Sequence, residues 1–263
     1  MWYLIRLTLF CGILVSFSIA YAEEKIVVAT ASNFLAPLKK LKIKFQSETK
    51  YSLIISSGST AKLYAQIMHG APFDVFLSAD QKSVSKLINN KKAIAGSEFV
   101  YAAGKLVLWG GEKNKSAEQL HIDLVTLNMT RFAVANSKLA PYGRASMEVL
   151  KNLNLEGGIK PYLIYGENIG QTFQFIYSEN VDLGFVAMSQ INSLKKAGVY
   201  WEVPTNLYQP IKQSAVMLNR AKNNKAAMAF LAFLQRPDIQ QYIADEFGYQ
   251  IFAAKQMLKR KNQ

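Results

Sequence analysis

The sequence predicts an α/β protein of two lobes, each a mainly parallel sheet flanked by helices, with a ligand cleft between the lobes. The first observation is a strand–loop–helix unit that occurs three times in the first half of the chain. The second is that the same unit occurs three more times from residue 132 onward. The third is a pair of extended segments, at 99–103 and 105–108, that can carry the chain into a second lobe. Repeated units of this kind build parallel sheets covered by helices.

In the first half, short apolar runs of strand length are each followed by a polar loop and a segment with helical periodicity. The expected strands are 25–30, 51–55 and 73–77, and the expected helices are 34–48, 61–67 and 81–89. In the second half the expected strands are 132–135, 162–165 and 183–186, and the expected helices are 143–153, 171–178 and 191–197. A strand at 211–218 then returns to the first lobe, and two helices, 224–234 and 237–247, close it.

The first 22 residues have the pattern of a signal peptide. Arg6 precedes an apolar run from Leu7 to Ile19, and a small-x-small triplet ends at Ala22. The run is shorter than the ~20 residues that a bilayer core requires, which favours export and cleavage over a membrane anchor. Cys11 lies inside the apolar run and is interpreted as part of the discarded leader. We therefore expect a periplasmic protein, either free or tethered at a surface.

These patterns predict the domain organisation. We expect the signal peptide at 1–22, the first lobe at 23–103 together with 215–263, and the second lobe at 104–214. Strand-end loops of two such lobes surround a shared cleft, where small ligands bind in this architecture.

Composition narrows the chemistry. Cys11 is the single cysteine of the chain, so removal of the leader excludes disulfides, thiolate catalysis and cysteine metal sites. The formal net charge is +13, which suits anionic partners. The lysines are scattered along the chain, so we interpret them as surface charge that attracts anions and expect no nucleic-acid partner.

Four polar loops lie where helices are expected to begin, two in each half of the chain. Free N–H groups and a partial positive potential at helix N-termini stabilise an anion without a cationic side chain. A single loop of this kind is more often an ordinary helix cap. Four converging loops favour a site for a tetrahedral oxyanion. The loops are 31–33, 58–60, 140–143 and 168–170.

Two stretches carry a resemblance to a known family. The runs 56–67 (SSGSTAKLYAQI) and 70–80 (GAPFDVFLSAD) resemble the signature of periplasmic molybdate-binding proteins of ABC importers. Segments 29–33, 141–143 and 166–170 match as well, so the similarity spans essentially all of the chain after the leader. The resemblance implies the two-lobed fold of type II periplasmic binding proteins. It also implies capture of molybdate or tungstate, delivery to a membrane permease, no enzyme activity, no cofactor, and a monomer.

The resemblance also implies which residues bind the oxyanion. It makes Ser32 a hydroxyl and amide donor with Asn33 beside it, and it places a donor from the second loop on either Ser59 or Thr60. In the second lobe the donors are the backbone amides of Tyr142 and Ile169. Some members add a tyrosine hydroxyl at the position that is Ala187 here, so Tyr142 could contribute through its own side chain instead. The full set is Ser32, Asn33, Ser59, Thr60, Tyr142 and Ile169.

Other readings remain open. A binding protein for another tetrahedral oxyanion such as sulfate, or an enzyme on the same scaffold, would have a similar pattern. Asp74 and Asp80 are interpreted as structural residues, and His69 and His121 have no partner at metal-ligand spacing. No Ser–His–Asp set is suggested. We therefore favour binding without catalysis, with molybdenum held only as the oxyanion.

Overall fold

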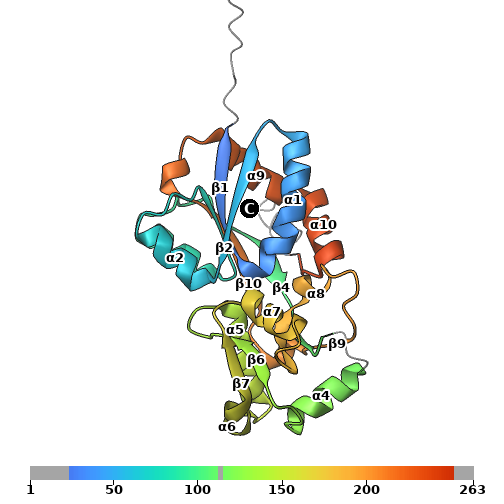
Figure 1. Cartoon of the computed structure of the whole chain (residues 1–263). Helices are drawn as coiled ribbons and strands as arrows, with labels where there is room; N and C mark the ends of the chain where they lie inside the picture. The colour runs from blue at the N-terminus through green and yellow to red at the C-terminus, as the bar shows by residue number, and fades with distance from the viewer. Residues whose placement is uncertain (1–23, 112–114, 252–263) are drawn as a thin grey trace, which may run out of the picture.

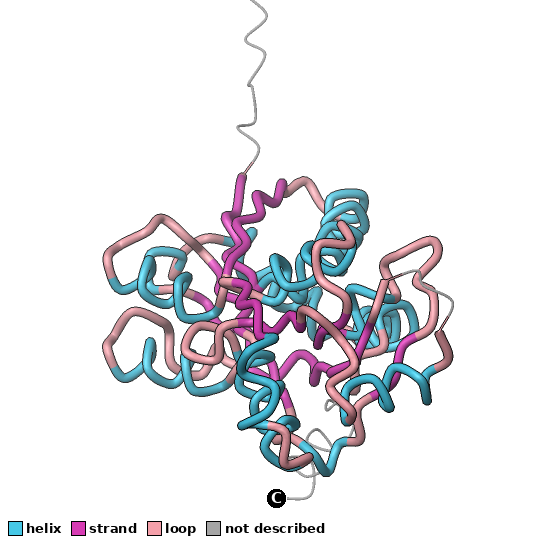
Figure 2. Tube along the Cα trace, turned by 60° about the horizontal axis from the view of Figure 1, so that its bottom comes forward, coloured by secondary structure: helices cyan, strands magenta, loops and turns pink. Residues whose placement is uncertain are grey.

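The structure is a computed structural model that describes residues 24–111 and 115–251. Two five-stranded sheets form two lobes, which Figure 1 shows one above the other. Figure 2 shows helices on both sides of the strands. The two-lobed α/β fold expected from the sequence is thereby confirmed, whereas the expected leader at 1–22 lies outside the described residues.

The first lobe has the strand order β2-β1-β3-β10-β4. Its three strand–loop–helix units run in parallel, and β10 is antiparallel to both of its neighbours. The strands are β1 (Lys25–Ala31), β2 (Ser52–Gly58), β3 (Val75–Ser78), β4 (Phe99–Gly104) and β10 (Ile211–Met217). The helices are α1 (Leu35–Glu48), α2 (Thr60–Met68), α3 (Gln81–Asn89), α9 (Lys225–Gln235) and α10 (Pro237–Phe247), with 3-10 turns at Ser32–Phe34 and Asn219–Ala221.

The second lobe has the order β7-β6-β8-β5-β9, in which β6 is parallel to β7 and β8 whereas β5 is antiparallel to β8 and β9. The strands are β5 (Leu106–Trp109), β6 (Phe132–Ala135), β7 (Leu163–Gly166), β8 (Leu183–Ala187) and β9 (Tyr200–Glu202). The helices are α4 (Ala117–Val125), α5 (Pro141–Asn152), α6 (Glu156–Ile159), α7 (Ile169–Tyr177) and α8 (Met188–Ile191), with 3-10 turns at Lys160–Tyr162 and Thr205–Leu207.

Each sheet is covered on both faces, which explains why the central strands appear in the sequence as continuous apolar runs. In the first lobe, β1 buries Ile26 and Val28 against α1, α9 and α10, while Ala29 belongs to the apolar layer beneath α2 and α3. In the second lobe, Phe132 and Phe185 pack edge to face at 5.2 Å. These cores hold the strand ends, and therefore the loops that follow them, at fixed positions.

One helix differs from the expectation. The segment 191–197 was expected to be helical, but α8 spans only Met188–Ile191. Asn192 and Ser193 follow it, and such residues favour turns over helix interiors because their side chains bond the nearby backbone. The hydroxyl of Ser193 does so, donating to the carbonyl of Ser189 at 2.6 Å.

The chain crosses between the lobes twice. The first crossing is at Lys105, between β4 and β5, and the second is between β9 and β10. The expected boundary at 214/215 falls inside β10, all of which lies in the first sheet. Ile211 pairs with Gly104 in that sheet. The two connecting strands therefore lie side by side.

No helix among the described residues combines the length and apolar character needed to cross a membrane.

Candidate functional site

A small cavity lies between the lobes, where the loops that follow β1, β2, β6 and β7 meet. It comprises about 180 Å³ of space between the surrounding atoms, including its opening. In Figure 1, α5 and α7 lie at the top of the lower lobe, directly beneath the first sheet. All six residues predicted from the sequence line this one cavity. Its lining is Ala31, Ser32, Asn33, Gly58, Ser59, Thr60, Ala79, Ala140, Pro141, Tyr142, Asn168 and Ile169.

Three helices begin at the cavity wall. They are α2 at Thr60, α5 at Pro141 and α7 at Ile169. The first N–H groups of a helix have no partner within it, and none of these helices carries an acidic residue in its first turn. Pro141 suits the first helical position because it has no N–H to leave unpaired. The wall therefore offers a positive potential from backbone groups alone.

Ser59 is a buried hydroxyl without a partner. It occupies the N-cap position of α2, yet its side chain caps nothing, and its Oγ has no hydrogen-bond partner although the residue is only 2% exposed. An N-cap serine ordinarily accepts from the first turn of its helix. Asn168 does so at α7, where its Oδ1 accepts from the N–H of Gln171 at 3.0 Å. Ser59 therefore has a hydroxyl available to a ligand in the cavity.

Thr60, the alternative donor of this loop, is already engaged. Its Oγ1 accepts from the N–H of Ala79 at 3.2 Å and so ties the loop at 58–60 to the segment that connects β3 with α3. Such a bond holds the two loops at a fixed separation. Of the two hydroxyls of this loop, that of Ser59 is therefore unpartnered and that of Thr60 supports the loop.

Ser32 connects the lobes at the edge of the cavity. Its Oγ accepts from the N–H of Gly170 at 3.1 Å. A serine hydroxyl that accepts one bond keeps its own proton to donate. Ser32 can therefore bind the second lobe and an oxyanion together.

Further contacts join the lobes around the cavity. The N–H of Ala61 donates to the carbonyl of Leu139 at 3.1 Å, and Lys62 pairs with Glu167 at 3.0 Å. Arg144 of α5 forms an ion pair with Asp80. Exposed ion pairs contribute about 0–1 kcal/mol each, so these two guide closure more than they drive it. The lobes are in contact on either side of the cavity, as in a closed binding protein.

Tyr142 directs its hydroxyl away from the strand-end loops and toward the crossing strands. The residue is 1% exposed, and its Oη accepts from Nε2 of Gln213 at 3.4 Å. A methyl group added at Gly104 would lie 1.9 Å from that Oη, so the hydroxyl packs directly against the glycine. The backbone N–H of Tyr142, in the first turn of α5, is the donor that this geometry presents to the cavity.

Ala187 is fully buried and offers no polar side chain. Its N–H donates to Oε1 of Gln190 at 2.9 Å, and Nε2 of the same glutamine donates to the carbonyl of Ile169 at 3.0 Å. Gln190 therefore holds the peptide of Ile169 against the end of β8. The contribution of Ala187 is thus its backbone N–H, which holds the side chain of Gln190 in place.

Sequence reasoning missed four residues of the site. Ser189 donates to the carbonyl of Asn33 at 2.8 Å, and Tyr249 donates to the same carbonyl at 3.1 Å. Gln190 and Gln213 complete the set. The sequence offers no clear signal for Gln213, because it lies between the polar residues Lys212 and Ser214 in β10.

The tyrosines behind the cavity are held neutral. Burial raises the pKa of Tyr101 and of Tyr142 well above the ordinary value of about 10, and it raises the pKa of Tyr249 to about 12. Neighbouring tyrosines add to the increase for Tyr142. All three hydroxyls therefore keep their protons at neutral pH, and those of Tyr101 and Tyr249 donate to Gln213 and to the carbonyl of Asn33.

These shifts predict alkaline sensitivity. A group whose pKa is raised on folding contributes stability that is complete below its unfolded pKa and is lost as pH rises through the folded value. We expect the free energy of unfolding to fall as pH rises beyond about 10. Tyrosinate absorbance of the native protein should show Tyr101, Tyr142 and Tyr249 ionising only together with unfolding. Ionisation of every tyrosine before unfolding would contradict the expectation, and denatured protein provides the reference titration.

Asp74, Asp80 and His121, considered above from the sequence, have structural partners. Oδ2 of Asp74 accepts from the N–H of Val27 at 2.7 Å, and Oδ1 of Asp80 caps α3 by accepting from the N–H of Ser83 at 2.8 Å. His121 stacks on Trp201 with ring centroids 4.4 Å apart. Within 24–111 and 115–251, no group of three or more His, Cys, Asp and Glu side chains could hold a metal ion.

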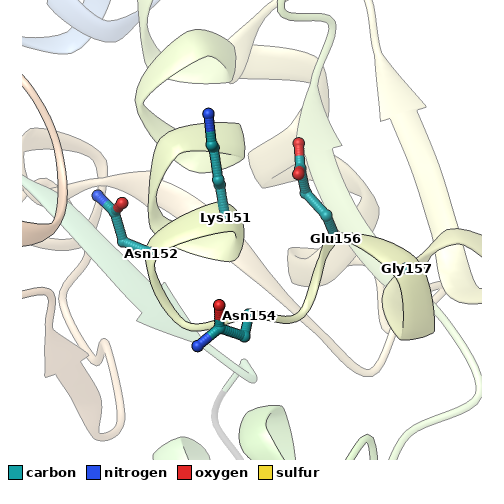
Figure 3. A pocket seen from close by; sticks show the side chains of 5 residues that line it. All are labelled: Lys151, Asn152, Asn154, Glu156 and Gly157. Atoms are coloured by element: carbon teal, nitrogen blue, oxygen red, sulfur yellow. The ribbon is translucent and has the colours of Figure 1, made fainter.

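A second hollow lies away from the cavity, at the end of α5 and the start of α6 (Figure 3). Lys151, Asn152, Asn154, Glu156 and Gly157 line it. Figure 3 shows Lys151, Asn152 and Glu156 standing apart rather than directed at a common point. This surface offers no converging donors comparable to those of the interlobe cavity.

Two lobes, an interlobe cavity and neutral donors from both sides define a binding protein for a small solute. The model of the family of bacterial extracellular solute-binding proteins matches residues 26–250. The chain belongs to this family.

Several characterised proteins resemble the chain over most of its length. The molybdate-binding protein ModA of Azotobacter vinelandii is 40% identical over 232 residues, which are 88% of this chain and 91% of that protein. ModA of Rhodobacter capsulatus is 38% identical, covering 87% of this chain and 89% of its own length. The solved structure of the periplasmic molybdate-binding protein of A. vinelandii superposes with a TM-score of 0.80 at 36% identity, covering 86% of this chain and 99% of that one. The resemblance found in the sequence is therefore confirmed.

Proposed function

We propose that this protein captures molybdate or tungstate in the interlobe cavity and delivers the oxyanion to the membrane permease of an ABC importer. The observation that carries the proposal is the unpartnered hydroxyl of Ser59, buried in the wall of a cavity that also contains the other five predicted residues. A buried polar atom without a partner is costly unless something binds it. The 40% identity to a molybdate-binding protein supports this choice of ligand.

The donors suit a fully ionised oxyanion. Ser32 and Ser59 contribute hydroxyls, and Tyr142 and Ile169 contribute backbone N–H groups at helix starts. No lysine, arginine or carboxylate is among the lining residues. Such neutral donors stabilise a dianion while leaving no buried cation uncompensated when the cavity is empty.

Size would provide selectivity. The loops are fixed to one another by the Thr60–Ala79 bond and by the Ser32–Gly170 bond, so the donors cannot collapse freely around a smaller tetrahedron. Sulfate is smaller than molybdate and would leave some of these hydrogen bonds long. Molybdate and tungstate are nearly equal in size, and the cavity is proposed to accept both.

The protein is proposed to bind without catalysis and without a cofactor. The lining residues include no histidine, lysine or carboxylate that could act as the base that activates a serine, and no cysteine that could act as a nucleophile. The carboxylate of Asp80, which lies nearby, already caps α3 and forms an ion pair with Arg144. If Ser32→Ala abolished turnover of an ester while leaving anion binding intact, the proposal would be wrong.

Closure provides a physical link to the transporter. Contacts between the lobes, such as the Ser189–Asn33 bond, form beside the ligand loops, so a bound oxyanion would favour the closed population. We propose that the permease recognises this closed form of a monomeric protein in the periplasm, after export directed by residues 1–22.

Isothermal titration calorimetry on refolded, ligand-free protein tests the proposal. Molybdate and tungstate should each bind one per chain with similar affinity. Sulfate should bind roughly a hundredfold more weakly, since two weakened hydrogen bonds to a charged group correspond to about 3 kcal/mol. Equal affinities for sulfate and molybdate would contradict the size argument, and absence of molybdate binding would contradict the proposed function.

A further inference from the structure

Gln213 is a buried amide at the junction of the two lobes. It lies in β10 and is fully buried. The pairing of β10 with β4 is irregular between Gln213 and Ser214. Such irregularities redirect a side chain locally. The amide of Gln213 thereby reaches residues from both lobes.

Its hydrogen bonds join the two ligand loops. Oε1 of Gln213 accepts from Nδ2 of Asn33 at 2.8 Å and from Oη of Tyr101 at 2.9 Å. Nε2 donates to Oη of Tyr142 at 3.4 Å. Asn33 belongs to the first-lobe wall of the cavity and Tyr142 to the second-lobe wall. Gln213 therefore connects the two walls through a single side chain.

The amide of Asn33 has one polar atom that this arrangement leaves without a partner. Nδ2 of Asn33 donates one hydrogen bond to Oε1 of Gln213 and another, at 3.0 Å, to Oη of Tyr249. Its Oδ1 has no partner although the residue is 2% exposed and lines the cavity. An unpartnered acceptor in the wall of an oxyanion site disfavours the ligand. The opposite orientation of the amide would present a donor there.

We propose that Gln213 is a positioning residue that orients Asn33 as a donor to the oxyanion, which extends the proposed function. When the amides of Asn33 and Gln213 turn together, Nε2 of Gln213 donates to Oδ1 of Asn33 and to Oη of Tyr101. Oη of Tyr249, which accepts from Nδ2 of Asn33 before the turn, then donates to Oδ1. Oη of Tyr142 then donates to Oε1 of Gln213, because a tyrosine hydroxyl can donate or accept. Nδ2 of Asn33 takes the position of the unpartnered oxygen and serves the ligand.

This arrangement also couples the donor to closure. The turned amide of Gln213 needs a donor for its Oε1, and that donor is Tyr142 of the second lobe. The favourable orientation of Asn33 is therefore stabilised only when the second lobe is in place. Only an amide can fill this role, because a carboxylate accepts without donating and an apolar side chain does neither.

A double-mutant cycle tests the inference, with molybdate affinity measured by calorimetry. Gln213→Met keeps the length of the side chain and removes the amide. It should weaken molybdate binding at least about tenfold, the size of one hydrogen bond to a charged group. In the Asn33→Ala background the same substitution should change affinity by no more than about twofold, because the donor it orients is absent.

Gln240→Met is the matched control. Gln240 is a buried glutamine of α10 whose Nε2 donates to the carbonyl of Leu234 at 2.6 Å, and it is not among the cavity-lining residues. It should lower the melting temperature while leaving molybdate affinity unchanged. An unchanged affinity for Gln213→Met, or an equal loss in both backgrounds, would overturn the inference while leaving the proposed function intact.

Two further outcomes are decisive. If the unaltered protein fails to bind molybdate, the proposed function and this inference both fail. If Gln213→Met does not fold, Tyr142→Phe removes the hydroxyl that donates to the turned amide and should weaken binding about threefold, again only when Asn33 is present. Equal loss in the Asn33→Ala background would again overturn the inference.

Discussion

Replacing Gly104 by alanine should weaken molybdate binding about ten- to a hundredfold while leaving the fold intact. The added Cβ would lie 1.9 Å from Oη and 2.8 Å from Cζ of Tyr142. Overpacking of this kind costs about 1–3 kcal/mol, and relief requires Tyr142 to withdraw together with the second-lobe wall of the cavity. The cost therefore falls on closure. Calorimetry with molybdate measures the loss.

Gly157→Ala provides the control for Gly104→Ala. A Cβ at Gly157 meets nothing within 4 Å, and the residue lies in α6, outside the cavity lining. Affinity should be unchanged in this variant. The melting temperature of ligand-free Gly104→Ala protein should stay near that of the unaltered protein, and the increase caused by molybdate should shrink. A large drop in the ligand-free melting temperature would show that Gly104 serves the fold rather than closure.

The sequence allowed the walls of the cavity to be predicted because their signals are local. A strand-length apolar run followed by a polar loop and a helical pattern places Ser32, Ser59, Tyr142 and Ile169 at strand ends, and strand ends of one sheet share an edge. The choice between Ser59 and Thr60 was not local. The contact that distinguishes the two hydroxyls is the bond from the N–H of Ala79 to Thr60, and Ala79 belongs to the next strand–loop–helix unit.

The residues behind the walls could not be predicted for the same reason. Asn33 and Gln213 are 180 positions apart, and Asn33 and Tyr249 are 216 apart. Nothing in the local pattern of β10 indicates that its glutamine meets a loop from the start of the chain. Periodicity reports which face of a strand is buried, whereas pairing across sheets is decided by the topology. Contacts of this range become visible only in three dimensions.

The two kinds of donor in the cavity imply different sensitivities to mutation. Tyr142 and Ile169 are expected to donate through backbone N–H groups, which substitution of their side chains does not remove. Ser32 and Ser59 are expected to donate through side chains. Ser32 also bonds Gly170, so its loss would affect closure as well as the ligand. Ser59 has no such second role among the described contacts, which makes it the cleaner test.

Ser59→Ala should weaken molybdate binding about ten- to a hundredfold, because a hydrogen bond to a charged acceptor contributes about 1.5–3 kcal/mol. The ligand-free protein should be as stable as before or more stable by up to about 1 kcal/mol, since the substitution removes a buried hydroxyl that has no partner. Affinity and stability would thus change in opposite directions. Calorimetry and chemical denaturation measure the two quantities.

Thr60→Val tests the neighbouring hydroxyl and should give the reverse pattern. Loss of Oγ1 leaves the buried N–H of Ala79 without an acceptor and should lower the free energy of unfolding by about 1–3 kcal/mol. Thr60→Ser keeps the hydroxyl and should preserve both properties. If Thr60→Val abolished binding while Ser59→Ala left it unchanged, Thr60 would be the donor, and the unpartnered hydroxyl of Ser59 would have no role in ligand capture.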